Sequence, residues 1–314
     1  MKTANRGCRF AVAVLTVAVL AGCAGKPGPT SSDEYGIFSD GESNATYATA
    51  FPVGSAEEAY QNGDLALQSG DRDRALFEFI RGLKLAKEPS AEALYKIGRI
   101  HHDRENYRLA DLAYRWALQQ APDSAQAGTG LGEVLLHRRQ YQAAEAQLQK
   151  VVELHEKAPW RAYNALGIIA DMNGEAAKAE QFYQQALAVA GQSAVVLNNL
   201  GYSRYLAGNW VGANEALQAA LRADSGYELA WRNLALVKAR QGDYDYALEA
   251  LVRSGQQAEA YNDVGYVSMM SGDYPRALSF FEEAMRLSPA YYVTASENAS
   301  SARRMLGRSG SAAE

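Results

Sequence analysis

The sequence predicts an all-α fold in which about seven helix-turn-helix repeats stack into a solenoid. Apolar residues recur at three- and four-residue steps from Ala56 onward, which fits the helical period and not a strand. In addition, a Gly or Ala in one helix is followed twelve residues later by an Ala in the next, and this pair recurs at steps of 34 or 35 residues. The first members of the seven pairs are Gly63, Gly98, Gly132, Gly167, Gly201, Ala235 and Gly265, with one shorter step of 30 residues before the last.

Residues 193–226 illustrate one repeat. Leu200 belongs to the apolar face of a first helix, Leu217 to that of a second, and Gly208-Asn209 break the chain between them. Apolar residues occupy more than one face of this pair, so it cannot bury its surface alone. We therefore expect each repeat to pack on its neighbours.

This pattern resembles the tetratricopeptide repeat over residues 56–289. The seventh copy matches it best, and the second copy, with Ile97-Gly98, Tyr107 and Ala110, is nearly complete. The resemblance implies a right-handed superhelix whose concave face is lined by the first helices. In each second helix, we expect the large residue four positions after the Ala to fill space toward the next repeat.

Two copies depart from the pattern. Ser254-Gly255 shorten the second helix of the sixth copy by about one turn, which predicts a bend in the stack. The third copy has extra glycines at Gly128 and Gly130, where either flexibility or close packing is the explanation.

The C-terminal residues 290–314 are predicted to form a capping helix and a mobile tail. Apolar residues between Tyr291 and Leu306 fall at helical spacing, and a terminal repeat needs a cover with a polar outer face. We expect the tail to begin at Gly307.

The N-terminus predicts a secreted, lipid-anchored protein. Residues 1–22 carry three basic side chains before a short apolar run, as in a secretory signal peptide. Leu20-Ala21-Gly22-Cys23 then resembles the lipobox of bacterial lipoproteins. That resemblance implies cleavage before Cys23, lipidation of its thiol, and, because Ala24 is not Asp, location at the outer membrane of a Gram-negative bacterium, facing the periplasm. The alternative is an ordinary secreted protein with a chance cysteine.

Residues 23–55 are expected to be a flexible tether after the lipidated cysteine. They are rich in Gly, Ser, Thr, Pro and Asp, and a coil of this length has a mean reach of about 30 Å. The cluster Tyr35, Ile37 and Phe38 is interpreted as part of this linker, with docking on the repeats or on a partner as the alternative.

Charge and motifs argue against nucleic acid and against catalysis. Removing residues 1–22 leaves 28 Lys and Arg against 36 Asp and Glu, so phosphate binding is disfavoured. His155-Glu156 lacks the second histidine of a zinc-protease motif, because Pro159 stands in its place. His101 and His102 lie on different helix faces. We expect no enzyme activity, no metal and no cofactor.

Partner binding is the expected use of the groove, and the repeat phase predicts its residues. Positions three before and one or four after each Gly/Ala marker should point inward, and they are rich in Tyr and Asn. For single residues, packing between repeats is an equally good interpretation. The predicted partner-binding residues are Tyr95, Asn164, Asn198, Tyr202, Tyr205, Arg232, Asn262 and Tyr266.

Several phrases resemble the tight-adherence (Tad, Flp-type) pilus assembly lipoproteins. Among them are Asn198-Asn199-Leu200-Gly201-Tyr202 and Tyr261-Asn262-Asp263-Val264-Gly265-Tyr266. The resemblance implies an outer-membrane scaffold or pilotin that binds a protein partner, such as a secretin or another pilus component. The alternative is an envelope adaptor that recruits cell-wall hydrolases or proteases.

Overall fold

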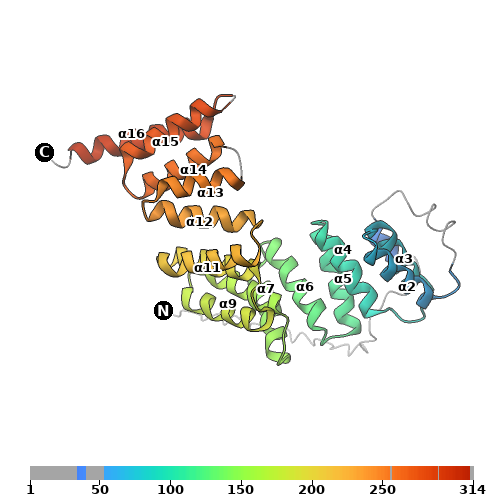
Figure 1. The fold of residues 1–314 in the computed structure, drawn as a ribbon. Helices are drawn as coiled ribbons and strands as arrows, with labels where there is room; N and C mark the ends of the chain where they lie inside the picture. Colours follow the sequence, from blue (N-terminus) through green and yellow to red (C-terminus); the bar gives the residue numbers. More distant parts are fainter. Residues whose placement is uncertain (1–33, 40–52, 255–256, 289, 312–314) are drawn as a thin grey trace, which may run out of the picture.

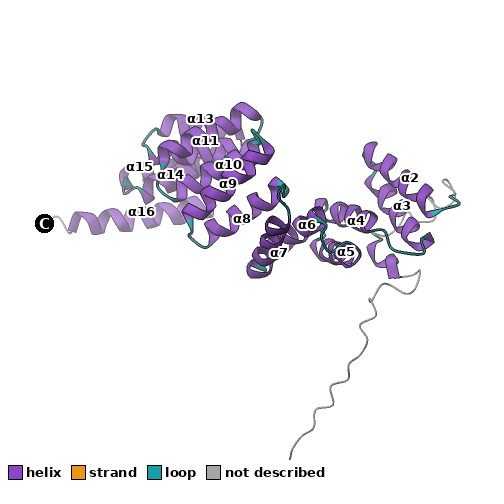
Figure 2. Ribbon diagram, turned by 90° about the horizontal axis from the view of Figure 1, so that it is seen from below, coloured by secondary structure: helices purple, strands orange, loops and turns teal. Residues whose placement is uncertain are grey.

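The computed structural model describes residues 34–39, 53–254, 257–288 and 290–311. These residues form fifteen α-helices and one short 3-10 helix, joined by loops and without a strand (Figure 2). The all-α prediction is thus confirmed for the described part of the chain. The predicted signal peptide, Cys23 and most of the expected tether lie outside the described residues.

Seven helix pairs follow one another in chain order and stack side by side, so that the two ends of the stack lie far apart (Figure 1). A short 3-10 helix, η1 (Glu34–Phe38), precedes them, and α16 (Val293–Ser311) follows them. The pairs are α2 (Ala56–Gln68) with α3 (Arg72–Leu85), α4 (Ala91–Asp103) with α5 (Tyr107–Gln120), α6 (Ala125–His137) with α7 (Tyr141–Leu154), α8 (Trp160–Met172) with α9 (Ala176–Ala190), α10 (Ala194–Leu206) with α11 (Trp210–Ala223), α12 (Glu228–Arg240) with α13 (Tyr244–Ser254), and α14 (Gln257–Met270) with α15 (Tyr274–Leu287).

Local sequence fixes where the helices begin and turn. The hydroxyls of Ser55, Ser90 and Ser124 accept hydrogen bonds from backbone N–H groups in the first turns of α2, α4 and α6. Between α10 and α11, Gly208 has a φ of 78°, a left-handed conformation that favours glycine, and Asn209 then caps α11. The predicted break at these two residues is confirmed.

The marker glycines let the two helices of a pair approach closely. A Cβ added to Gly201 would lie 2.6 Å from Leu217 Cγ, and one added to Gly167 would lie 2.6 Å from Tyr183 Cε1. The large residue of the second helix therefore packs over the glycine of its own pair. It also reaches the next repeat, as expected, since Leu217 clusters with Leu234 and Val237 of α12.

The extra glycines of α6 are explained by packing. A Cβ on Gly130 would lie 2.5 Å from Tyr114 Cζ, and one on Gly128 would lie 2.7 Å from Val151 Cγ2. Tyr114 extends from the preceding repeat, where it also covers Gly98. Of the two explanations left open by the sequence, close packing is the one that the structure supports.

The shortened helix α13 and the capping helix α16 were both predicted, but the end of α16 was not. Helix α13 has 11 residues whereas α15 has 14, which confirms the shortened sixth copy. Helix α16 packs through the fully buried Ala299 and Ala302 against α15, as expected of a cap. It continues past Gly307 to Ser311, beyond the expected end at Leu306.

The segment η1 docks on the first two repeats. Tyr35 and Phe38 are buried, and both rings meet Trp116 of α5 edge-on, with centroids 5.9 and 5.2 Å apart. His101 of α4 places its Nε2 3.0 Å from the carbonyl oxygen of Phe38. Tyr35 and Phe38 are thus part of the hydrophobic core, and the interpretation of this segment as free linker is wrong. Two aromatic residues in a short, non-periodic segment do not suffice to predict this contact from the sequence.

Candidate functional site

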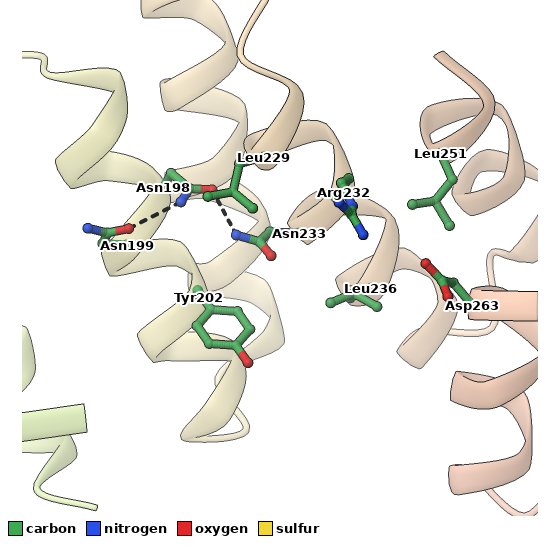
Figure 3. Close-up of a pocket in the computed structure, with 9 residues that line it drawn as sticks. All are labelled: Asn198, Asn199, Tyr202, Leu229, Arg232, Asn233, Leu236, Leu251 and Asp263. Atoms are coloured by element: carbon green, nitrogen blue, oxygen red, sulfur yellow. Dashed lines mark hydrogen bonds between the residues drawn. The ribbon is translucent and has the colours of Figure 1, made fainter. Parts of the chain in front are cut away.

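A cavity of about 420 Å³ lies at the junction of the fifth, sixth and seventh repeats, and it is called the α12 cavity here. Helix α12 forms its centre, α10 and α14 flank it, and the end of α13 contributes one leucine (Figure 3). Most lining residues therefore come from first helices. The lining residues are Asn198, Asn199, Tyr202, Leu229, Arg232, Asn233, Leu236, Leu251 and Asp263.

Three of the predicted partner-binding residues line this cavity. They are Asn198, Tyr202 and Arg232. Tyr202 is 41% exposed, and Arg232 is exposed as well. The repeat phase therefore predicts correctly that Tyr202 and Arg232 are accessible from the face formed by the first helices.

The predicted asparagines, in contrast to Tyr202 and Arg232, form hydrogen bonds with other asparagines along the stack. Asn199 donates through Nδ2 to Asn164 Oδ1 at 2.9 Å, and Asn233 donates in the same way to Asn198 Oδ1 at 2.8 Å. We call such a pair an amide rung: its two side chains come from adjacent first helices, or from the last first helix and the capping helix α16, about one repeat apart in sequence. A third rung joins Asn298 of α16 to Asn262 at 3.0 Å.

The rungs correct the prediction for three residues. Asn164, Asn198 and Asn262 are buried, with 9%, 1% and 7% of their surface exposed. Asn198 also donates to Asn199 Oδ1 at 3.2 Å, so both ends of its amide are used within the protein. Asn164, Asn198 and Asn262 are thus structural residues, since a buried amide that already has partners has little to offer a ligand.

The remaining predicted residues are spread over the structure. Tyr266 is 48% exposed but does not line the α12 cavity. Tyr205 is half-buried against the core between α11 and α12, and its ring stacks on that of Tyr202 with centroids 6.1 Å apart. Tyr95 lines a separate cavity of about 70 Å³ between the second and fourth repeats. The eight predicted residues therefore do not form a single site.

The smaller cavity contains an ion pair between repeats. Arg161 of α8 donates through Nε and one Nη to both carboxylate oxygens of Glu133 of α6, at 2.8 and 2.9 Å. Burial raises the pKa of Glu133, and the hydrogen bonds from Arg161 oppose this shift. The pair links α6 to α8, and its two-point geometry makes it a specific contact between the repeats.

His102 lies beside this ion pair within a cluster of aromatic rings. Its ring is 5.9 Å from that of Tyr107 and 5.6 Å from that of His137, and burial lowers its pKa to about 4, with Arg161 adding to the effect. His101 points elsewhere, toward η1. The described residues hold no group of three or more His, Cys, Asp or Glu side chains placed to bind a metal ion.

The sequence-based prediction missed a second position in the first helices, two residues before each marker, that also faces the cavity. Asn199, Asn233 and Asp263 each stand two residues before a marker, and all three line the α12 cavity. A usable signal existed. Asn164 and Asn199 are 35 residues apart, as are Asn198 and Asn233, and a spacing of one repeat places such residues on adjacent helices.

Comparison with known proteins agrees with this architecture. Residues 60–111 and 123–192 match models of the tetratricopeptide repeat family. The human cell division cycle protein 16 homolog is 26% identical over 135 residues, which cover 39% of this chain and 22% of that protein. The chain thus spans about a fifth of the length of this relative and of its mouse counterpart.

Two solved structures share the fold. The crystal structure of the Cut9–Hcn1 hetero-tetramer of APC/C has a TM-score of 0.58 at 17% identity, over 82% of this chain and 51% of that one. A tetratricopeptide repeat protein from Parabacteroides merdae has a TM-score of 0.55 at 15% identity, over 79% of this chain and 98% of that one.

These matches and the stack of helix pairs define the class of the protein. The chain contains tetratricopeptide repeats, matched over residues 60–111 and 123–192, and its described residues fold as a solenoid of helix pairs. Such solenoids offer extended surfaces for binding other proteins, and a protein partner is the ligand that this fold suggests. No described helix is long and apolar enough to cross a membrane.

Proposed function

We propose that this protein is a lipid-anchored scaffold or pilotin of the outer membrane, which binds a protein partner during assembly of a Tad/Flp-type pilus or its secretin. The observation that carries the binding role is the α12 cavity, where Arg232 and Tyr202 are exposed among three leucines. Arg232 makes no ion pair within the described residues, so its guanidinium is available to a partner.

The proposed location depends on Leu20-Ala21-Gly22-Cys23, which resembles a lipobox. Two or three acyl chains on Cys23 would anchor the repeats stably, since each buried methylene contributes about 0.8 kcal/mol. The periplasmic, pilus-related role follows from the phrases that resemble tight-adherence lipoproteins, two of which border the α12 cavity.

Affinity capture from detergent-solubilised membranes tests the pilus role. We expect pilus secretin subunits or another pilus component to be recovered with the wild-type chain. Recovery of cell-wall hydrolases or proteases in their place would support the envelope-adaptor alternative. Unchanged secretin level, location and multimerisation after deletion of the gene would contradict the pilus role.

Two exposed tyrosines provide variants that test the binding surface. Tyr202→Ala and Tyr266→Ala should weaken capture while leaving helical circular dichroism unchanged, because both side chains are exposed. Tyr291→Ala is the matched control, since Tyr291 is 77% exposed and lies before the capping helix. If Tyr202→Ala and Tyr266→Ala captured the partner as well as Tyr291→Ala and the wild-type chain, the face of the first helices would not be the binding surface.

Lipidation is tested separately. We expect the wild-type chain to stay with membranes in high salt, and Cys23→Ala to be released, because salt screens charge attraction but leaves acyl chains inserted. A Cys23→Ala chain that remained with the membrane would remove the basis for the lipid anchor.

A further inference from the structure

The ladder of amide rungs is interrupted at the α12 cavity. Arg232 stands three residues before its marker, the position that Asn198 has in the preceding repeat. Asp263 stands two residues before its marker, the position that Asn233 has. Between α12 and α14, an arginine and an aspartate therefore occupy the two places where the neighbouring junctions have hydrogen-bonded asparagines.

This junction is open. Arg232 and Asp263 face each other across the cavity, and neither a hydrogen bond nor an ion pair within 4.0 Å joins them among the described residues (Figure 3). The second helix of this repeat, α13, is also the shortest of the seven at 11 residues, and its Leu251 forms part of the cavity wall. The space that a rung closes elsewhere is thus left for another molecule.

The two side chains have opposite hydrogen-bonding capacity. A guanidinium has only donors, and an ionised carboxylate has only acceptors. Burial raises the pKa of Asp263, although a 3.4 Å hydrogen bond from Asn262 and the charge of Arg232 oppose the shift. The carboxylate is thus poorly hydrated and gains from an additional donor.

Charge complementarity limits what can bind between them. A ligand carboxylate would pair with Arg232 but meet the like charge of Asp263, and a ligand ammonium would pair with Asp263 but meet Arg232. An amide avoids both conflicts. Its carbonyl accepts from Arg232, its N–H donates to Asp263, and in a trans peptide these two groups point in opposite directions.

We propose that the α12 cavity binds an uncharged main-chain amide of an extended partner peptide, which completes the open rung between Arg232 and Asp263. Leu229, Leu236 and Leu251 line the cavity beside this pair and provide an apolar wall for an aliphatic side chain next to the bound amide. This inference rests on the proposed function in one respect, namely that a protein partner occupies this surface.

Three small probes with the same aliphatic side chain test the preference for an uncharged amide. They are acetyl-leucine N-methylamide, which is neutral, acetyl-leucine, which has a carboxylate, and leucine N-methylamide, which has an ammonium group. Each is titrated into the full chain in detergent micelles at constant ionic strength. The NMR signal of the Arg232 Nε–Hε group in nitrogen-labelled protein reports binding.

We expect the neutral probe to bind about tenfold more tightly than either charged probe, as loss of one charge-assisted hydrogen bond implies. Arg232→Met and Asp263→Asn should each weaken its binding by a similar factor, followed through the methyl signals of Leu236. Arg222→Met, at an exposed site on α11, is the control and should bind the neutral probe as wild type does.

Each other result overturns the inference. Tighter binding of acetyl-leucine would make Arg232 a carboxylate receptor, and tighter binding of leucine N-methylamide would make Asp263 an ammonium receptor. No binding of any probe at tens of millimolar would exclude a ligand site of this kind. None of these results depends on a pilus partner, whereas failure to capture one would contradict the proposed function and leave the probe measurements unaffected.

Discussion

Asn233 donates a side-chain N–H to the carbonyl oxygen of Asn198 at 2.8 Å across the junction of two repeats. Both residues are buried, and the two helices that carry them face each other along the stack. A hydrogen bond between buried amides has strict geometric requirements, so it fixes the register of α12 against α10. Apolar contacts alone would tolerate small shifts along the helix.

Replacement of Asn198 by Ala should therefore destabilise the fold. The change leaves the buried Asn233 without an acceptor for its side-chain N–H, at a cost of about 1–3 kcal/mol, and removes the donor to the half-buried Asn199. Urea unfolding followed by circular dichroism measures this cost. Asn173→Ala is the control, because Asn173 is an exposed residue at the end of α8. An equal effect of both variants would mean that the rung contributes nothing.

Two glycine-to-alanine variants in helices should have opposite effects. Gly130→Ala places a Cβ 2.5 Å from the ring of Tyr114, so we expect the strain to cost about 1–3 kcal/mol despite the better helix propensity of Ala. Gly307→Ala in α16 meets no atom within 4 Å and should stabilise its helix by up to about 1 kcal/mol. Thermal unfolding of both variants compares them. Stabilisation by Gly130→Ala would contradict the packing explanation.

The docked segment η1 should detach when Phe38 is replaced by Ala. Phe38 is fully buried, and the removal of a buried phenylalanine ring costs up to about 3–5 kcal/mol. The amides of residues 34–39 should then lose protection in hydrogen exchange. Ile37→Ala, in the same turn but 47% exposed, is the matched control and should keep that protection. Unchanged exchange in Phe38→Ala would show that the ring does not hold the segment.

Stability should fall in mild acid because of His102. Burial lowers the pKa of this histidine to about 4, from 6.5 in the unfolded chain. Between these values the unfolded state binds a proton that the folded state does not, so the free energy of unfolding decreases as the pH falls through this range. The loss is complete below about pH 4. Because the ring is partly exposed, we expect a decrease on the order of 1–2 kcal/mol.

Urea unfolding between about pH 7 and pH 4.5 measures this dependence. His102→Gln should lose most of it, because glutamine does not titrate. An NMR titration of His102 near its unperturbed pKa would contradict the explanation, whatever the unfolding data showed.

The repeat architecture could be predicted because several independent signals agree. A residue such as Gly201 marks a close helix contact, Gly208 marks a turn, and the spacing of both recurs along the chain. These features depend on local backbone geometry and on contacts within one repeat, which periodicity reports directly.

The site was only partly predictable, because residues at the same position of the repeat have different environments in different repeats. Asn198 and Arg232 stand at equivalent positions, yet the first is buried in a rung and the second is exposed in a cavity. The difference depends on the residue that the next repeat places opposite, Asn233 in one case and Asp263 in the other. Periodicity within one repeat cannot reveal that partner.

The docking of η1 changes the length of chain available between Cys23 and the repeats. Only residues 24–33 separate that cysteine from Glu34, and even a fully extended chain of this length spans about 35–40 Å. If Cys23 is acylated, this short segment would hold the first two repeats close to the bilayer. The α12 cavity lies toward the opposite end of the stack, several repeats away from the anchored end (Figure 1).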